Sequence, residues 1–253
     1  MHPSPSSLNV ILFDLGSTLI YSKHPWPPIF EQADRALVKV LKQAGIPLEI
    51  EAFSREFESF LDSYYAERGA SPIEKTTFSV LGELLEQKGF HEIPASVVRA
   101  ALDAMYSITQ GNWYLEADAI PTLGTLREQG YRLGMISNTS DDKDVQQLVD
   151  RWELRPHFEA IITSAGCGFR KPDERIFRLA LDTLGVLPEQ AAMVGDTLEA
   201  DILGANQAGL YSIWITRRSQ DPQEGELTIQ PQAVITALSQ LPELLADVES
   251  NAP

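Results

Sequence analysis

The sequence predicts an α/β fold, a parallel β-sheet with helices on both faces, interrupted by an all-helical segment. From about residue 115 onward, short apolar runs alternate with amphipathic stretches, which is typical of strands joined by crossover helices. Between residues 23 and 114, by contrast, four successive apolar faces have helical spacing. We therefore expect a core built from residues 1–22 and 115–253, and a helical domain, residues 23–114, inserted into it.

The first strand of the expected core is the apolar run from Val10 to Phe13, which is too short for a helix. The run stops at Asp14, and residues 15–18 are predicted to form a tight turn because Gly and Ser interrupt strands. An acid at the carboxyl end of a buried parallel strand lies where open α/β sheets bind their ligands. For Asp14 alone, a solvated strand end or a helix cap would be the simpler interpretation.

The helical segment begins, in this interpretation, after a linker at residues 23–28. Its apolar faces fall within residues 33–44, 53–64, 78–85 and 97–105. We expect these side chains to form a core of their own rather than to contact a cofactor. Insertions are tolerated in surface loops, and this one follows the first strand. The helical domain is therefore placed to cover the ligand-binding edge of the sheet.

The rest of the expected core alternates strands and helices. Strands are predicted at residues 131–136, 158–163, 191–194 and 210–215, with helices at 121–129, 172–184 and 198–208. Asp141 is expected to cap a further helix, and Pro172 to occupy the first turn of the helix that follows it. Residues 217–230 are predicted to be a loop, and two apolar segments, 233–238 and 241–248, close the chain.

The composition is that of an ordinary soluble globular protein, with 43% hydrophobic and 22% charged residues in 253. No run of eighteen apolar residues predicts a membrane span, and residues 1–7 lack the pattern of a secretory signal. The single cysteine, Cys167, excludes an internal disulfide, which favours a cytoplasmic location. No neighbouring pattern marks Cys167 as a nucleophile.

The charge of the chain argues against polyanionic partners. Its formal net charge of −16 disfavours both nucleic acid and anionic lipid. An anionic substrate would therefore need a local source of positive charge, which a divalent cation and a lysine could supply.

Polar groups follow the predicted strands at four places in the core. They are Asp14, the pair Ser137 and Asn138, Lys171 within residues 168–173, and the two acids Asp196 and Asp201. Because the carboxyl ends of parallel strands meet at one edge of a sheet, these groups are expected to lie near one another.

Taken in order, these four stretches resemble the motifs of the haloacid dehalogenase (HAD) superfamily, particularly its metal-dependent phosphatases. They read Phe-Asp-Leu-Gly-Ser-Thr-Leu, Ile-Ser-Asn, Arg-Lys-Pro-Asp and Val-Gly-Asp-Thr with a later Asp. One such motif would be weak support, and four in register are specific. The resemblance covers nearly the whole chain and implies a Rossmann-like, HAD-like core sheet with a helical cap inserted after the first motif.

The resemblance also implies roles for the polar groups. Asp14 would attack phosphorus and form an aspartyl-phosphate, which splits hydrolysis into two easier steps. Lys171 would neutralise the charge of the carboxylate and the phosphate, and Ser137 and the backbone N–H of Asn138 would bind phosphate oxygens. Arg170, beside Lys171, is expected to be a surface residue.

A magnesium site is implied by the same resemblance. Asp14, Asp196 and the backbone carbonyl of Gly16 would bind Mg²⁺, which prefers oxygen ligands. Asp201 would be a further ligand or an acid that holds the ligands and waters in place. An exposed charge on a first helical turn is the simpler alternative for Asp201.

One position departs from the motif of the family's phosphatases. The residue two after the nucleophile is usually a second Asp that protonates the leaving oxygen, and here it is Gly16. Loss of a general acid–base costs about 10²–10⁴-fold in rate. Ser17 and Thr18 are poor substitutes. Three explanations stay open: a cap residue or water serves instead, the substrate has a good leaving group such as an anomeric sugar phosphate or an acyl phosphate, or the catalyst is weak or lapsed.

We therefore expect a Mg²⁺-dependent phosphomonoester hydrolase of a small phosphorylated metabolite. The alternatives are a non-catalytic member that binds a metabolite or a protein, which Gly16 favours, and a 2-haloacid dehalogenase, whose halide leaves without a proton but whose reaction needs no metal. Cap residues would set specificity. The candidates, for each of which a surface or packing role is the simpler interpretation, are Tyr21, His24, Trp26, Arg68, Lys75, Trp113 and Tyr114.

Overall fold

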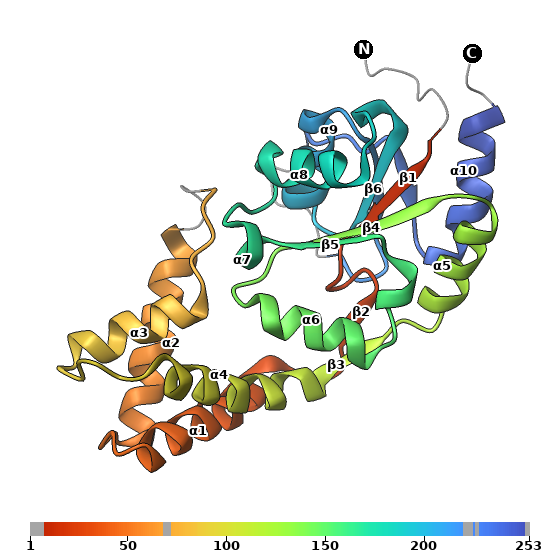
Figure 1. Ribbon diagram of the computed structural model, residues 1–253. Coiled ribbons are helices and arrows are strands. Elements are labelled where there is room, and N and C mark those ends of the chain that lie inside the picture. The colour runs from red at the N-terminus through yellow and green to blue at the C-terminus, as the bar shows by residue number, and fades with distance from the viewer. Residues whose placement is uncertain (1–7, 68–71, 220–224, 226–227, 251–253) are drawn as a thin grey trace.

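A six-stranded parallel sheet forms the centre of the protein in a computed structural model that describes residues 8–67, 72–219, 225 and 228–250 (Figure 1). The strand order is β5-β4-β1-β6-β7-β8. The strands are β1 (Val10–Phe13), β4 (Arg132–Ser137), β5 (Ala160–Thr163), β6 (Ala191–Gly195), β7 (Tyr211–Ile215) and β8 (Ala233–Ile235). All neighbouring pairs are parallel, which confirms the predicted fold class.

Helices cover both faces of this sheet, as the alternating pattern predicts. On one face lie α5 (Ala119–Glu128), α6 (Asp142–Arg151) and α10 (Leu241–Ser250). On the other lie α8 (Glu174–Leu184) and α9 (Gly204–Ala208). Along β1, Ile11 and Phe13 join the first hydrophobic cluster and Val10 and Leu12 join the second. All four are fully buried, because a central parallel strand is covered on both sides.

The segment between β2 (Ile20–Ser22) and β3 (Trp113–Leu115) is helical, as predicted, and has its own hydrophobic core. Its helices are α1 (Trp26–Gln43), α2 (Ile50–Glu67), α3 (Thr77–Gln87) and α4 (Ala95–Thr109), which gather beside the sheet in Figure 1. β2 and β3 pair antiparallel where the chain leaves and re-enters the core. We propose that the division into a core (residues 1–22 and 115–253) and a cap (residues 23–114) runs along this two-stranded connection.

The predicted linker at residues 23–28 is wrong in its second half, because α1 already begins at Trp26. Pro25 is the residue before the helix, and two further prolines lie in its first turn. Proline is tolerated there since the first N–H groups of a helix have no partner within the helix, and its ring presets the helical φ. A cluster of prolines can therefore start a helix as well as form a linker.

The helix after Lys171 also begins later than predicted. Asp173 is its N-cap and accepts a hydrogen bond from the backbone N–H of Arg175 at 2.9 Å, so Pro172 precedes the helix. The predicted cap of α6 is confirmed, since the Asp141 carboxylate accepts from the N–H of Asp144 at 3.2 Å.

The remaining predicted elements are found with small shifts. The strand predicted at 158–163 begins at Ala160, after a 3₁₀ turn at Arg155–His157. The helix predicted at 198–208 is a π-helical segment, Leu198–Leu203, continued by α9. A short helix, α7 (Ser164–Cys167), follows β5 directly. Among the described residues, no helix is long and apolar enough to cross a membrane.

Candidate active site

The order of the strands brings three of the predicted polar positions together. β1 lies between β4 and β6, and Phe13 pairs with both Met135 and Val194. The next residue, Asp14, is held in register because its N–H donates to the carbonyl of Val194 at 2.9 Å. Asp14, Ser137 and Asp196 therefore emerge at the same edge of the sheet.

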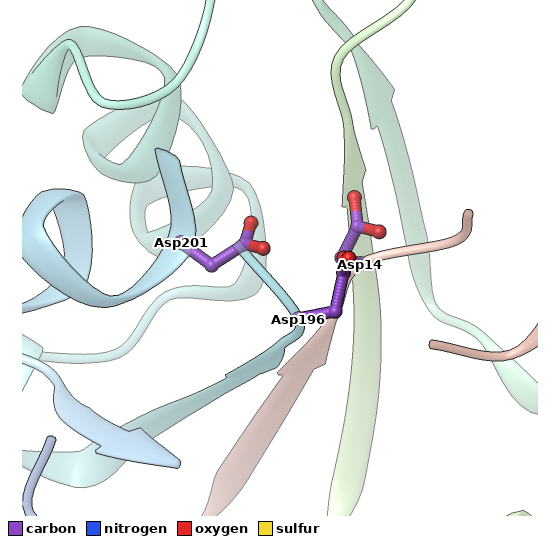
Figure 2. A group of neighbouring side chains, drawn as sticks. All are labelled: Asp14, Asp196 and Asp201. Carbon is purple, nitrogen blue, oxygen red and sulfur yellow. The ribbon is translucent and has the colours of Figure 1, made fainter. Parts of the chain in front are cut away.

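Asp201 reaches this edge from the segment after β6. Its carboxylate packs so closely on Gly195 that a Cβ there would lie 2.3 Å from it, so no larger residue fits at that position. The N–H of Thr197 donates to Oδ2 of Asp201 at 3.0 Å. Figure 2 shows this carboxylate pointing toward the end of β1, where Asp14 and Asp196 lie close together. Asp201 is 1% exposed, so the alternative of an exposed helical charge is wrong.

Lys171 lies at the centre of this group. Its Nζ donates to Oδ1 of Asp14 at 2.7 Å, to Oδ1 of Asp201 at 2.6 Å and to the carbonyl of Ile136 at 2.8 Å. The Lys171 side chain is only 1% exposed. An ammonium group has three donors, and here all three have acceptors, so its position is fixed.

The Asn138 side chain positions the backbone of Lys171. Its Nδ2 donates to the carbonyl of Lys171 at 2.9 Å, and its Oδ1 accepts from the N–H of Lys171 at 2.8 Å. Sequence reasoning considered only the backbone N–H of Asn138 and missed this role. The signal was available in principle, because a side-chain amide has the donor and acceptor needed to pair with a backbone peptide.

Negative charge exceeds positive charge in this group. Burial, partly offset by Lys171, raises the pKa of Asp14 to about 6. Burial, together with Asp14 and Asp201, raises the pKa of Asp196 to about 8. Burial lowers the pKa of Lys171, but the two carboxylates that it contacts outweigh this effect and raise it overall. One ammonium thus leaves the three acids incompletely neutralised.

The residues fit a magnesium ion. Asp14, Asp196 and Asp201 each offer a carboxylate oxygen, and these oxygens lie within 4.8 Å of one another. Oxygen donors of this kind are the ligands that Mg²⁺ prefers, and a cation would offset the excess negative charge. Gly16, whose carbonyl was the fourth predicted ligand, lies in the turn directly after Asp14, where Ser17 has a left-handed φ of 59°.

Trp113 occupies the space beside Gly16. A Cβ at Gly16 would lie 3.6 Å from Cη2 of the Trp113 indole, which is ordinary van der Waals contact. Trp113 belongs to β3, about a hundred residues further along the chain. The Trp113 ring therefore lies on the side of the site where the side chain of an acid–base residue at position 16 would lie.

A loop of the cap reaches the edge of the site through Glu74, which is buried. Its carboxylate accepts from the hydroxyl of Ser164 at 2.9 Å, and that hydroxyl accepts from the N–H of Thr139 at 2.8 Å. Arg170 is not the surface residue we expected, since its side chain is 18% exposed and lies 3.6 Å from Glu74. Ser137 is buried as well, and its hydroxyl makes no hydrogen bond to a described residue, so it is free to meet a ligand.

The predicted specificity residues of the cap have different surroundings. Lys75 is paired with Glu83 of α3, and Arg68 lies outside the described residues. The Arg218 guanidinium lies over the ring of Tyr21, and the Lys23 ammonium lies over the ring of Tyr114.

The backbone of His24 hydrogen-bonds the Asn112 side chain. Only Trp26 and Trp113, among the predicted specificity residues that the structure describes, line a large cavity. These two tryptophans are therefore the candidates best placed to contact a substrate.

A family model described as haloacid dehalogenase-like hydrolase matches residues 8–209. The chain belongs to this family of hydrolases. It is 31% identical over 246 residues to a glyceraldehyde 3-phosphate phosphatase of Methanothermobacter thermautotrophicus, covering 94% of this chain and 100% of the relative. It is 29% identical over 221 residues to the enzyme of the same name from Methanopyrus kandleri, covering 86% of this chain and 88% of the relative.

Solved structures of the family share the fold. A 2-haloacid dehalogenase from Pseudomonas syringae superposes with a TM-score of 0.67 at 24% identity, over 95% of this chain and 99% of its own. The match of the family model confirms the resemblance that the four motifs carry as membership of the HAD-like hydrolase family.

Proposed function

We propose that this HAD-like hydrolase is a Mg²⁺-dependent phosphatase that hydrolyses a small phosphorylated metabolite through an aspartyl-phosphate intermediate. The observation that carries the proposal is the group formed by Asp14, Lys171 and the two acids that follow β6, in which all but the half-buried Asp196 are buried. It combines a carboxylate nucleophile, a fixed ammonium and a set of oxygen donors for a cation. The two relatives named as phosphatases support the same reaction class.

In the first step, a carboxylate oxygen of Asp14 forms a bond to phosphorus and the bond from phosphorus to the leaving oxygen breaks. Lys171, 2.7 Å from Asp14, offsets the negative charge of the carboxylate and of the incoming phosphate. The Ser137 hydroxyl and the N–H of Asn138 bind phosphate oxygens. In the second step water attacks the aspartyl-phosphate, which releases phosphate and restores Asp14.

Asp14, Asp196 and the Gly16 carbonyl would hold the magnesium ion, with Asp201 as a ligand or as a support for the ligands. When bound, the ion supplies positive charge that stabilises the phosphoryl oxygens. Asp201 is also fixed by Lys171 and by the N–H of Thr197, so its orientation does not depend on the ion.

Gly16 determines which substrates suit the site. With no carboxylic acid beside the leaving oxygen, the departing group takes its proton from water or leaves as a stable anion. Acyl phosphates and anomeric sugar phosphates are therefore expected to react faster than simple alkyl phosphates. The described environment of Gly16 offers only the Trp113 ring within 4 Å of a Cβ, and an indole carbon cannot replace an acid.

Gly16 also supports a second candidate, a non-catalytic protein that binds a phosphorylated metabolite. That function would need the phosphate-binding groups but no proton transfer. Dehalogenation of 2-haloacids is the weaker alternative, because the cluster of three acids would have no role in a reaction without a metal. The free Cys167 is consistent with the cytoplasmic location that we propose for this protein.

The deciding experiment is phosphate release from a panel of phosphorylated metabolites that includes acyl and anomeric sugar phosphates, with Mg²⁺ or with EDTA. The Asp14→Asn variant is assayed in parallel. Release that requires both Mg²⁺ and Asp14 supports the phosphatase. Absence of release, with metabolite binding retained, would favour the non-catalytic protein, and halide release that persists in EDTA would favour the dehalogenase.

A further inference from the structure

A cavity of about 820 Å³ lies where the cap meets the core. Its walls come mostly from α1, α2 and α4 of the cap, with Thr77 of α3 and Trp113 of β3, and Ser140 and Asp144 contribute from the core. Ser140 is two residues beyond Asn138, so the cavity adjoins the loop proposed to bind phosphate. Cavities of roughly 300–1,000 Å³ are typical of sites for small organic ligands.

An aromatic wall joins this cavity to the proposed catalytic group. Trp113 lines the cavity and is also the residue whose ring lies 3.6 Å from a Cβ at Gly16. Trp26 follows with its ring centroid 5.2 Å from that of Trp113, and Phe30 stacks on Trp26 at 5.1 Å. A leaving group bound to a phosphate at Asp14 would therefore extend along aromatic rings into the cavity.

The charged residues that line the cavity are mostly acids. Among its described residues, the acids are Glu31, Asp34, Glu51, Glu58, Asp62 and Asp144, against two arginines and no lysine or histidine. Arg35 is already engaged by Glu31 at 2.9 Å and by Glu51 at 3.5 Å. An anionic leaving group, such as a carboxylate or a second phosphate, would be repelled by these walls.

In two of these acids, the effect of burial on the carboxyl group is not fully offset by neighbouring positive charge. Burial and the nearby Glu58 raise the pKa of Asp34 to about 7. Burial raises the pKa of Asp144 to about 7, although its carboxylate accepts a hydrogen bond from Gln110 at 2.9 Å. Both carboxyl groups would gain from a ligand that brings N–H donors or positive charge.

Resting on the phosphatase function, we propose that the cavity binds the leaving group of the substrate, and that this group carries an aromatic ring with N–H donors and no negative charge. The ring stacks on the tryptophans, and the donors meet the acids. A nucleoside and an aromatic amine share this chemistry. A three-carbon leaving group such as that of glyceraldehyde 3-phosphate would leave most of the cavity unfilled.

The first experiment measures binding rather than turnover. Tyramine and 4-hydroxyphenylacetate have the same phenol ring and opposite charges, and cytidine represents the nucleosides. Each is titrated into the wild-type protein by isothermal calorimetry. We expect tyramine or cytidine to bind at least about tenfold more tightly than 4-hydroxyphenylacetate. Equal or tighter binding of the carboxylate overturns the proposal.

Variants then locate the binding. Asp34→Asn is expected to reduce the preference for the cation severalfold. Its control is Glu86→Gln, which removes the same charge from an exposed position of the cap that does not line the cavity. Trp26→Ala is expected to weaken all ring-bearing ligands, and Trp26→Phe to restore most of the affinity. Variants with unchanged affinity would place the binding elsewhere and contradict the proposal.

A parallel assay of phosphate release separates the two proposals. Tyramine phosphate and cytidine 5′-monophosphate are compared with glyceraldehyde 3-phosphate and acetyl phosphate. If acetyl phosphate is hydrolysed but no ring-bearing ligand binds, the leaving-group proposal fails and the phosphatase stands. If the ring-bearing ligands bind and no compound releases phosphate, the phosphatase fails, and the cavity is a binding site for the ring-bearing ligand but not for a leaving group.

Discussion

The acids at the edge of the sheet and the acids in the cap cavity are both partly removed from water, but their partners differ. Asp14 and Asp201 are bridged by the Nζ of Lys171, which the core itself supplies. Asp34 makes no hydrogen bond to a described residue, and Asp144 has a neutral partner in Gln110. The group at the edge of the sheet therefore includes its own countercharge, whereas the two cavity acids, Asp34 of the cap and Asp144 of the core, are the ones that we propose a ligand satisfies.

This difference indicates that the two sites have different roles. A site that must stabilise the same phosphoryl group in every turnover gains from groups that are fixed in advance. A site that selects a leaving group gains from groups that become satisfied only when the right ligand is bound. The four predictions that follow test this comparison, from the largest expected effect to the smallest.

Removal of the nucleophile should have the largest effect. Asp14→Asn keeps the size of the side chain but cannot form the aspartyl-phosphate, so we expect kcat to fall by roughly 10⁴-fold or more. Phosphate release with Mg²⁺ measures it. The matched control is Asp150→Asn, an exposed acid paired with Arg155 on the surface, which should leave the rate unchanged. Activity close to wild type in Asp14→Asn would exclude the proposed mechanism.

Loss of the central ammonium should affect both rate and stability. Lys171→Met leaves Asp14 and Asp201 without their shared partner, and breaking a buried ion pair destabilises by about 3–5 kcal/mol. The rate should fall by about 10²–10³-fold, as for removal of a fixed charge-stabilising group. Urea unfolding and steady-state kinetics measure the two effects. The control is Lys143→Met, because the exposed ion pair of Lys143 with Asp103 should contribute less than about 1 kcal/mol to the free energy of unfolding.

Restoration of the missing acid should raise the rate. The backbone of Gly16 has no left-handed φ, and a Cβ there would only touch Trp113, so Gly16→Asp is sterically acceptable. We expect a gain of about 10²-fold for alkyl phosphates, the lower end of the range for general acid catalysis, and little gain for acyl phosphates. Gly16→Asn fills the same space without an acid and is the control. An equal gain in both variants would mean that the effect is steric.

The smallest effect is a change in stability with pH at Asp34. Its pKa of about 7 in the folded state lies above the ordinary aspartate value of 3.8, so the folded protein holds a proton that the unfolded chain releases. The wild type should therefore lose stability relative to Asp34→Asn as the pH rises from about 4 to above 7.

Solvent screening at this half-buried side chain keeps the difference to about 1–2 kcal/mol at pH 8. Urea unfolding of both proteins at pH 5 and pH 8 measures it. The same comparison for Glu86→Gln should show no such pH dependence. A difference between Asp34→Asn and wild type that does not change with pH would mean that Asp34 is not protonated in the folded protein near neutrality.

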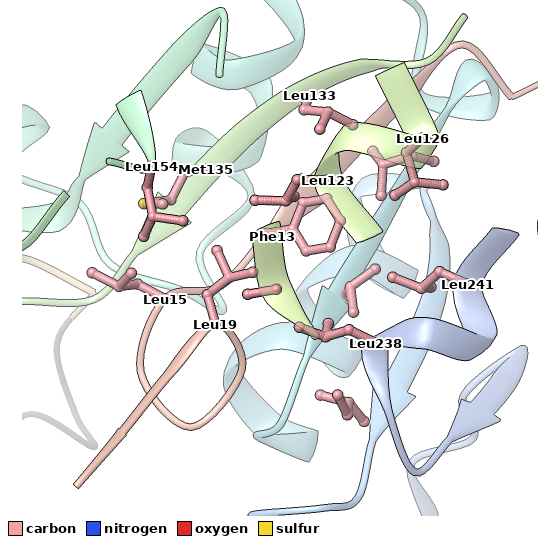
Figure 3. Close-up of a cluster of buried hydrophobic side chains, with 14 of the residues drawn as sticks. Phe13, Leu15, Leu19, Leu123, Leu126, Leu133, Met135, Leu154, Leu238 and Leu241 are labelled. Carbon is pink, nitrogen blue, oxygen red and sulfur yellow. The ribbon is translucent and has the colours of Figure 1, made fainter. Parts of the chain in front are cut away.

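Much of the fold followed from local patterns. The apolar run Val10–Phe13 is β1 with the same bounds, and Phe13 packs with Leu123 and Leu126 of α5 in the core (Figure 3). Periods of two and of 3.6 are local properties, so they predict strands and helices before any tertiary contact is known. The three-residue strands β2 and β3 were missed because only their pairing with each other marks them as strands.

The sequence by itself also determined which polar groups meet at the edge of the sheet. Asp14, Lys171, Asp196 and Asp201 follow strands or precede helices, and parallel strands place their carboxyl ends together. It did not reveal that the Asn138 side chain anchors Lys171 or that Asp201 packs on Gly195, because both depend on distances of a few ångströms between separate segments.

Only the tertiary structure decided what stands beside Gly16. Trp113, the residue beside Gly16, is about a hundred positions away in the sequence. The cavity next to Trp113 is formed mainly by helices, and their sequence patterns predict which face of each helix is buried but not the angles at which the helices cross. Hydrophobic periodicity fixes which side of a helix is buried, whereas the shape of the space between helices depends on how all of their side chains pack together. The proposed catalytic residues could therefore be predicted from the chain, and the proposed leaving-group pocket could be recognised only in the folded protein.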